Sequence, residues 1–577
     1  MKFEKADERI DGGHAFRAMA AYAKWLEDCS DEARRELAIL RCLGLFDRPA
    51  DAGCISALRR EPAIDGLTES LVGLDDADWN LALSSLTDCG LISFASDQSV
   101  IGSWQSAIDS HPHIREYFAK QLRETNPDAW RAAHRRLYEH LCANTDEGDQ
   151  PTLEDLQPLY QAVAHGCQAG LQQEACEKVF FKRVRRRNED YPTRKLGAFA
   201  SELACAACFF EQPWSRIFPA VTEMWQAWLL AVAAFDLRAL GRLAEVRELI
   251  QAGRPIEIRR KDWTNASISG NNLSELELTL GDVDMAVGDA EQSVTYADRS
   301  GDALMREVTR SIHADTLYQA GRLDEAATRF REAEEIHAKA RPETPLLYSI
   351  RRFRYCGLLL AAPERAAWRE GSGQKAMGSG LKADGKVQKS DSVEICRNVA
   401  ERAVQTLGWA EQHLSFLDIA LDHLTLGCAA LYAAILADST LETPNSELVQ
   451  AMDGLRRASA QEFIARGLLT RAWLRFLTGA CTGSESAQED LDEAWEIAER
   501  GPMKLFMADI HLYRARLFGG MKDEGGRMKY PWDKNPDGSS RGPKDDLDAA
   551  ERLINQCGYH RRDEELADAR KAVNRES

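Results

Sequence analysis

Three segments of the chain share one pattern at a constant spacing. They read "ALGRLAEVRELI" from residue 239, "TLGDVDMAVGDA" from residue 279 and "QAGRLDEAATRF" from residue 319, and their glycines Gly241, Gly281 and Gly321 stand 40 residues apart. A weaker fourth copy, "QAGLQQEACEKV", surrounds Gly170. A fixed period of this length is typical of repeat proteins, in which each unit buries its apolar face only by stacking on its neighbours.

Each copy predicts two helices joined at the glycine. Glycine accepts the left-handed conformation that ends a helix, so the first helix should stop there. Apolar residues at i, i+3, i+4 and i+7 mark the buried face of the second helix. In the third copy these are Leu323, Ala326, Ala327, Phe330, Ala333 and Ile336. The pattern resembles tetratricopeptide repeats in a long variant, which implies an α-solenoid of helical hairpins.

The remaining segments extend this mainly α prediction. Residues 490–500 and 546–558 are expected to be further second helices. The stretch 369–392 is rich in Gly, Lys and Ser and predicts a flexible insertion. We therefore expect a helical lead-in over 1–30, a winged-helix-like domain over 31–145, repeats over 146–368, the insertion over 369–392, and further repeats with a cap over 393–577.

The region before residue 125 has a different pattern. Asp75 and Asp76 start a predicted helix that stops at Gly90, and "LISF" and "SVIGSWQSAI" then suggest two strands near 91–108. The segment "IDSHPHIREYF" (108–118) leads into another helix. A helix, a β-hairpin and a helix in this order describe a winged-helix module.

This order, from "LAILRCLGLFDRPAD" through "LTDCGLIS" to the repeats, resembles the C-terminal part of STAND-class (NB-ARC-like) signalling ATPases. In that family a histidine at the end of the winged helix, within a Met-His-Asp motif, contacts the nucleotide phosphate. The resemblance places His111 in that position as a remnant of nucleotide sensing, with Ser110 and Pro112 replacing its neighbours. The alternative is a structural corner, in which His111 caps and Pro112 starts the helix.

No ATPase domain is apparent before residue 31. The string "GLKADGKV" (380–387) has the glycine and lysine spacing of a phosphate loop, but Val387 stands where Ser or Thr would reach magnesium. We therefore expect no cofactor. The chain would be either a free-standing module or a subunit of a STAND-class ATPase whose P-loop domain is on another chain.

Charge argues against a third alternative, a winged-helix DNA-binding regulator. The net charge is −19, and the helix before the predicted wing contains Asp75, Asp76, Asp78 and Asp88 with no Lys or Arg. DNA-binding helices need basic or polar side chains for phosphates and bases. The basic run "FKRVRRRNED" (181–190) could touch phosphate, but a solvated helix face is the simpler interpretation. The charge distribution therefore argues against a nucleic-acid partner.

Two clusters suggest metal or redox chemistry and are better explained without it. His111, His113 and Asp109 lack the further ligands of a zinc site. The pair Cys205 and Cys208 lies in an apolar run with no second pair, which favours core packing. We expect no metal site, and no nucleophile–base set suggests an enzyme.

These patterns predict a non-enzymatic sensor or scaffold in bacterial signalling or defence. A protein or peptide would bind to exposed residues of the first helices. The candidates chosen by helical phase are Asn265, Asn272, Glu275, Arg310, His313 and Tyr318. Fourteen irregularly spaced cysteines, no signal peptide and no apolar run of the ~18–20 residues that span a bilayer predict a cytoplasmic protein without a membrane partner.

Overall fold

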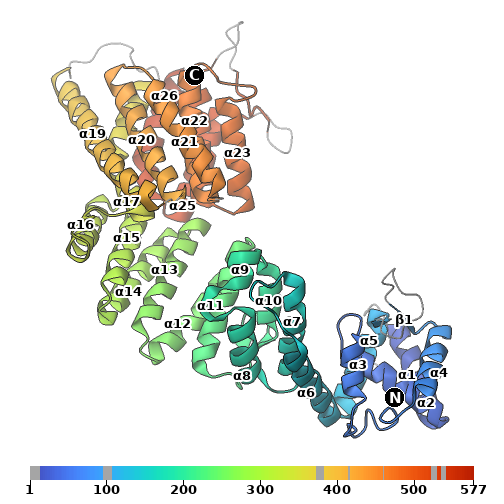
Figure 1. The fold of residues 1–577 in the computed structure, drawn as a ribbon. Coiled ribbons are helices and arrows are strands. Elements are labelled where there is room, and N and C mark those ends of the chain that lie inside the picture. Colours follow the sequence, from blue (N-terminus) through green and yellow to red (C-terminus); the bar gives the residue numbers. More distant parts are fainter. Residues whose placement is uncertain are drawn as a thin grey trace. The chain divides into compact units, whose positions relative to one another are not determined.

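A computed structural model describes residues 13–94, 107–371, 382–413, 416–458, 460–521, 529–534 and 541–576. The described chain is mainly α-helical (Figure 1). Its strands form two short antiparallel pairs. It divides into two compact units, residues 1–249 and 250–577. The boundary between the units falls inside the predicted repeat region. The reason is that α6 (Pro127–Asn144), at the end of the predicted winged-helix region, packs against α7 (Leu153–Gln168), at the start of the predicted repeats.

The first half of the first unit surrounds a two-stranded hairpin. Strands β1 and β2 pair Ile92 with Ser110 and Phe94 with Ile108, so β2 begins where the predicted second strand ends, and residues 95–106 of that prediction lie outside the described residues. The elements are α1 (Gly13–Asp28), α2 (Asp31–Leu43), α3 (Ala52–Leu58), α4 (Asp76–Asp88), β1 (Ile92–Phe94), β2 (Ile108–Ser110), α5 (Pro112–Thr125) and α6 (Pro127–Asn144).

The second half of the first unit is a less regular helical array. It contains a ten-residue π-helix, η2, that begins within the weak fourth copy of the repeat. The elements are α7 (Leu153–Gln168), α8 (Gln172–Glu174), η2 (Ala175–Val184), η3 (Arg187–Glu189), α9 (Tyr191–Leu196), α10 (Phe199–Ala207), β3 (Phe210–Gln212), β4 (Arg216–Ile217) and α11 (Glu223–Ala239). Helix α12 (Leu243–Arg259) continues the chain into the second unit.

The second unit begins with the predicted helical hairpins. Helix α13 (Trp263–Leu280) ends at Gly281 and pairs with α14 (Val283–Ser300), and α15 (Ala303–Gln319) is followed by Gly321 and α16 (Leu323–Ala340). Gly281 and Gly321 have φ values of +84° and +78°, the conformation expected of a glycine that ends a helix. The α-solenoid prediction is therefore confirmed for these repeats.

Later helices of the second unit continue the stack without the 40-residue period. They are α17 (Ser349–Leu359), α18 (Ala361–Gly371), α19 (Lys382–His413), α20 (Phe416–Ala437), α21 (Glu442–Arg457), α22 (Gln461–Leu477), α23 (Ala487–Arg500), α24 (Lys504–Phe518), α25 (Pro543–Cys557), η4 (His560–Arg562) and α26 (Asp563–Glu576) (Figure 1). Residues 382–392 belong to α19, which corrects the predicted insertion: buried Cys396 and Val399 anchor the helix downstream. Residues 372–381 lie outside the described residues.

Helix α20 has a length and composition that would allow it to cross a membrane. Its 18-residue window has a mean hydropathy of 1.7, but 67% of that window is buried inside the protein. It packs against α19 and α21, and its Asp422 forms an ion pair with Arg352 at 2.8 Å. Core helices of water-soluble folds have the same composition, so this feature is weak evidence for a membrane.

The C-terminal helices return to the first repeats of the second unit. Helix α24 contacts α13, and η4 contacts α15. At the turn after α13, a Cβ on Gly281 would lie 2.7 Å from the Sγ atom of Cys557 and 2.9 Å from the Cβ atom of Lys504. This close approach closes the array of inward-facing helices around a common interior.

We expect Gly281→Ala to destabilise the second unit more than Gly301→Ala does. Both glycines have positive φ, which costs alanine about 1–2 kcal/mol. Only Gly281 has neighbours within 4 Å, so its variant should lose about 1 kcal/mol more through overpacking. Hydrogen exchange of α24 and α25 in increasing urea would measure the difference. Equal losses in the two variants would contradict the close approach.

Candidate functional site

A cavity of about 180 Å³ lies inside the second unit. Its wall is formed by the inward faces of α13, α15, α17, α18, α20, α22 and α24. Tyr559 and Arg561 complete the wall from residues 558–562 between α25 and α26, here called the C-terminal turn. The first helices of the repeats therefore converge on one space. A cavity on which polar and aromatic side chains from several helices converge is a candidate ligand site.

One end of the cavity is acidic. Arg354 on α17 forms ion pairs with Glu275 of α13 at 2.8 Å and with Asp315 of α15 at 3.2 Å, and Glu462 at the start of α22 also lines this end. Burial alone would lower the pKa of the Arg354 guanidinium, but these three carboxylates outweigh burial and raise it. One guanidinium thus faces three carboxylates.

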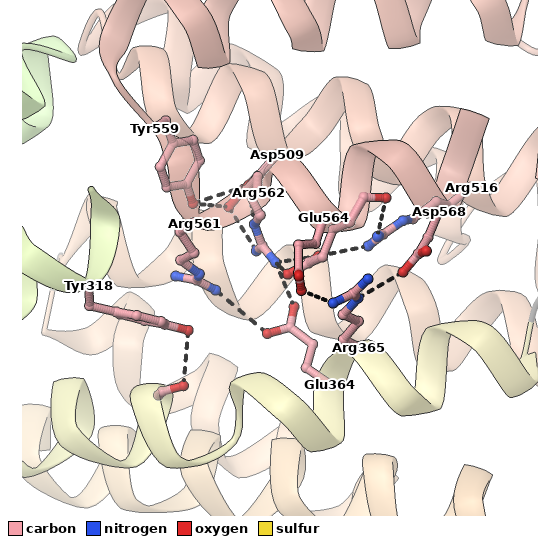
Figure 2. Close-up of polar contacts among 12 residues, drawn as sticks. Tyr318, Glu364, Arg365, Asp509, Arg516, Tyr559, Arg561, Arg562, Glu564 and Asp568 are labelled. Atoms are coloured by element: carbon pink, nitrogen blue, oxygen red, sulfur yellow. Dashed lines mark hydrogen bonds and ion pairs between the residues drawn. The ribbon is translucent and has the colours of Figure 1, made fainter. Parts of the chain in front are cut away.

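The other end of the cavity contains a buried network of arginines and carboxylates (Figure 2). Arg562 is fully buried, and its guanidinium lies 3.2 Å from Glu364 and 2.9 Å from Asp509. Tyr559 donates a hydrogen bond to Asp509 at 3.2 Å. Burial alone would raise the pKa of Glu364, but Arg562 and the neighbouring arginines outweigh it, so this pKa lies well below its usual range.

Two guanidinium groups of this network face the cavity with long contacts. Arg466 lies 3.4 Å from Glu364 and 3.9 Å from Asp509, and Arg561 lies 3.6 Å from Glu364. The Nε atom of Arg561 is buried without a hydrogen-bond partner. Arginine carries five donors, so these two side chains retain capacity to bind an anion in the cavity.

Aromatic side chains form the wall between the two ends. Phe353 and Phe463 meet edge to face with ring centroids 5.5 Å apart. Tyr318 donates a hydrogen bond to the carbonyl of Gly357 at 3.1 Å, and the Arg561 guanidinium lies 4.4 Å from its ring centre. The stacked arginine is held against this wall by a cation–π contact.

The structure places two of the six predicted binding residues, Glu275 and Tyr318, on the cavity wall. Asn265 and Asn272 are exposed on α13. Arg310 forms an ion pair with Asp298 at 2.9 Å.

His313 and Tyr318 correct the expectation of exposed contacts, because both side chains are buried. Burial and the nearby Arg329 lower the pKa of His313 to about 4. Helical phase identified a face of α15, but neighbouring helices cover that face.

Sequence reasoning missed Glu364, Glu462, Arg466, Asp509 and Arg561, which complete the cavity. They come from helices beyond the regular 40-residue period. A sequence pattern that could have identified them is a charged residue within an apolar helical run, such as Arg466 in "EFIARGLL". A buried charge requires a partner, so such positions mark ionic contacts within the core.

His111 caps a helix in the first unit. Its ring Nδ1 atom accepts a hydrogen bond from the backbone N–H of His113 at 3.3 Å, and Pro112 occupies the first turn of α5. This geometry agrees with the structural-corner interpretation of the segment.

The basic run at 181–190 is largely engaged in local contacts. Arg183 donates to the carbonyl of Cys142 at 2.7 Å, and Arg185 forms an ion pair with Glu202 at 2.7 Å. Arg186 donates to the backbone carbonyls of Gly148 and Asp149. These arginines tie η2 to neighbouring segments, which leaves few of them available to a phosphate backbone.

The metal and phosphate-loop patterns have local explanations. Among the described residues, no group of three or more His, Cys, Asp or Glu side chains is placed to hold a metal ion. Cys205 is buried, and burial raises the pKa of the Cys208 thiol to about 11, which disfavours the reactive thiolate. The segment 382–387 is helical, whereas phosphate binding requires a glycine-rich loop.

Comparison with known proteins adds little to this picture. Neither a protein-family model nor a curated protein matches the chain. One similar solved structure is a Signal Transduction ATPase with Numerous Domains (STAND) protein with a tetratricopeptide repeat sensor, from Pyrococcus horikoshii, at 14% identity and a TM-score of 0.32. The match covers 84% of this chain and 66% of that one. A TM-score this low carries no argument about function.

Proposed function

We propose that the chain is a non-enzymatic interaction scaffold whose second unit binds a protein or peptide partner through the central cavity. The observation that carries this proposal is the convergence of charged and aromatic side chains from α13, α15, α17, α22 and α24 on one space. Repeat proteins use such inward-facing helices as binding surfaces. Exposed Asn265 and Asn272 on α13 are proposed as additional contacts outside the cavity.

Screening a displayed peptide library for binding to the purified full chain tests this function. We expect selected peptides to bind at least tenfold more weakly when Glu275 and Glu462 are both replaced with glutamine, because both side chains line the cavity. The matched control is Glu401→Gln, an exposed position on α19 of the same unit, which should leave binding unchanged. Selection of no peptide, or equal binding to the double variant, would contradict the proposal.

We propose as a second candidate that the chain serves a STAND-class ATPase whose nucleotide domain is on another chain, in bacterial signalling or defence. The order α4, the β1–β2 hairpin and α5 supports a winged-helix module over residues 31–145. His111 at the start of α5 would then be exposed to a phosphate brought by the partner. Co-purification with a P-loop protein would support this candidate, and loss of that complex in His111→Ala would connect it to the histidine.

The same module is not proposed as a DNA reader. Helix α4 would be the reading helix, and Asp75 caps its first turn by accepting a hydrogen bond from the backbone N–H of Asp78 at 2.8 Å. Arg35 approaches α4 as an ion-pair partner of Asp78 at 3.1 Å. Carboxylates on this surface repel a phosphate backbone.

A further inference from the structure

The two ends of the central cavity differ in charge: carboxylates gather around one arginine at one end, and arginines outnumber carboxylates in the network at the other end. At the acidic end, Glu275 and Asp315 both pair with the single guanidinium of Arg354, and Glu462 lines the same end. The network at the other end has four guanidinium groups, Arg466, Arg516, Arg561 and Arg562, and three carboxylates, Glu364, Asp509 and Glu565. Of these, Arg466, Arg561, Glu364 and Asp509 line the cavity, and the others lie behind them. A ligand that complements both ends therefore carries a carboxylate and at least one cation.

Helix α22 sets the spacing between these charges. Glu462 and Arg466 are four residues apart on this helix and both line the cavity. Four residues correspond to about 6 Å along a helix axis, a distance that an extended lysine or arginine side chain can bridge. Aromatic Phe353, Phe463 and Tyr318 would contact its aliphatic stem and cation.

The cavity has room for one such group. Its volume of about 180 Å³ exceeds the ~150 Å³ of an engineered cavity that holds benzene. The long contacts of Arg466 and the unpartnered Nε atom of Arg561 indicate where a carboxylate would dock. Glutamate or another acidic ligand would add negative charge to the acidic end, and an alkyl ligand would leave both ends unpaired.

We propose that this cavity binds a basic amino acid, arginine or lysine, either free or as the C-terminal residue of a peptide. Its α-carboxylate lies between Arg466 and Arg561, and its side-chain cation lies among Glu275, Asp315 and Glu462. This proposal rests on the proposed function, because it identifies the chemistry of the partner that enters the same cavity.

Isothermal titration calorimetry of the full chain tests the proposal. L-Arginine or L-lysine should bind at least tenfold more tightly than agmatine, which lacks the carboxylate, and than L-citrulline, which lacks the side-chain charge. The peptide Gly-Gly-Arg and its C-terminal amide distinguish the two sources of the ligand. If Gly-Gly-Arg binds and its C-terminal amide does not, the ligand is the C-terminal end of a peptide. If L-arginine binds and Gly-Gly-Arg does not, the ligand is a free amino acid.

Variants at each end keep the test specific. Arg466→Gln should weaken arginine binding at least tenfold, and because that residue belongs to a buried network, Glu462→Gln provides an independent test at a partly exposed position. Glu401→Gln should have no effect. The proposal is overturned if neither arginine, lysine nor Gly-Gly-Arg binds, if agmatine and citrulline bind equally well, or if Glu462→Gln changes nothing. If library peptides nevertheless bind more weakly to the Glu275 and Glu462 double variant, the proposed function is retained although the basic ligand is excluded.

Discussion

Replacing Arg562 with methionine is expected to lower the free energy of unfolding of the second unit by about 3–5 kcal/mol. The Arg562 guanidinium is fully buried and approaches three carboxylates: Asp509 at 2.9 Å, Glu565 at 2.6 Å and Glu364 at 3.2 Å. Methionine fills similar space but leaves Asp509 and Glu565 without their central cation. Removing one partner of a buried ionic network costs more than the network contributes, because the remaining charges stay buried.

Hydrogen exchange of α24 and α26 in increasing urea would measure this loss separately from the first unit, since a two-unit chain does not unfold in one step. The matched control is Arg570→Gln on α26, the helix that follows Arg562. Arg570 forms half-exposed ion pairs with Asp548 and Glu551, both at 2.7 Å, and such pairs contribute about 0–1 kcal/mol. If the two variants lost equal stability, the buried network would not hold the C-terminal turn in place.

The buried carboxyl of Asp236 is expected to make the first unit less stable as pH rises from about 4 to 8. Asp236 on α11 and Glu202 on α10 are fully buried, and Arg185 lies 2.7 Å from Glu202. Burial, followed by the charge of Glu202, raises the pKa of Asp236 to about 8. Two carboxyl groups with one guanidinium therefore hold an extra proton at neutral pH.

The sign follows from proton binding. An unfolded aspartate loses its proton near pH 4, whereas Asp236 in the folded unit keeps it up to about pH 8. The folded state thus binds more protons across this window, so raising the pH favours unfolding, by up to about 1.4 kcal/mol per pH unit. This contribution is fully present below pH 4 and is lost as pH rises through 8.

Asp236→Asn should flatten this slope, because asparagine keeps the shape of a protonated aspartate without titrating. Hydrogen exchange of α10 and α11 in urea at pH 5.5, 6.5 and 7.5, corrected for intrinsic exchange rates, would measure it. Glu154→Gln, at an exposed position in the same unit, should retain the wild-type slope. Identical slopes in the wild type and in Asp236→Asn would show that this carboxyl pair does not hold the proton.

Several elements were predictable from local signals. Gly281 and Gly321 end helices where the sequence predicts, because left-handed φ values and the apolar stripe of a second helix are encoded within a few residues. His111 and Pro112 likewise form the predicted helix start. The start of α19 was not predictable, because its Gly, Lys and Ser content indicates a loop and its helical state depends on core contacts further along the helix.

The sequence by itself therefore determined the repeated hairpins, because helix ends and buried faces are set by residues within one or two turns. Only the tertiary structure decided that Arg562 meets Glu364, 198 residues away in the chain, and that Glu275 and Arg466 line the same cavity. Partners at such separations are brought together by how each repeat packs on the next and by the return of the C-terminal helices. No local pattern records that geometry, because it is the sum of many small rotations between neighbouring repeats.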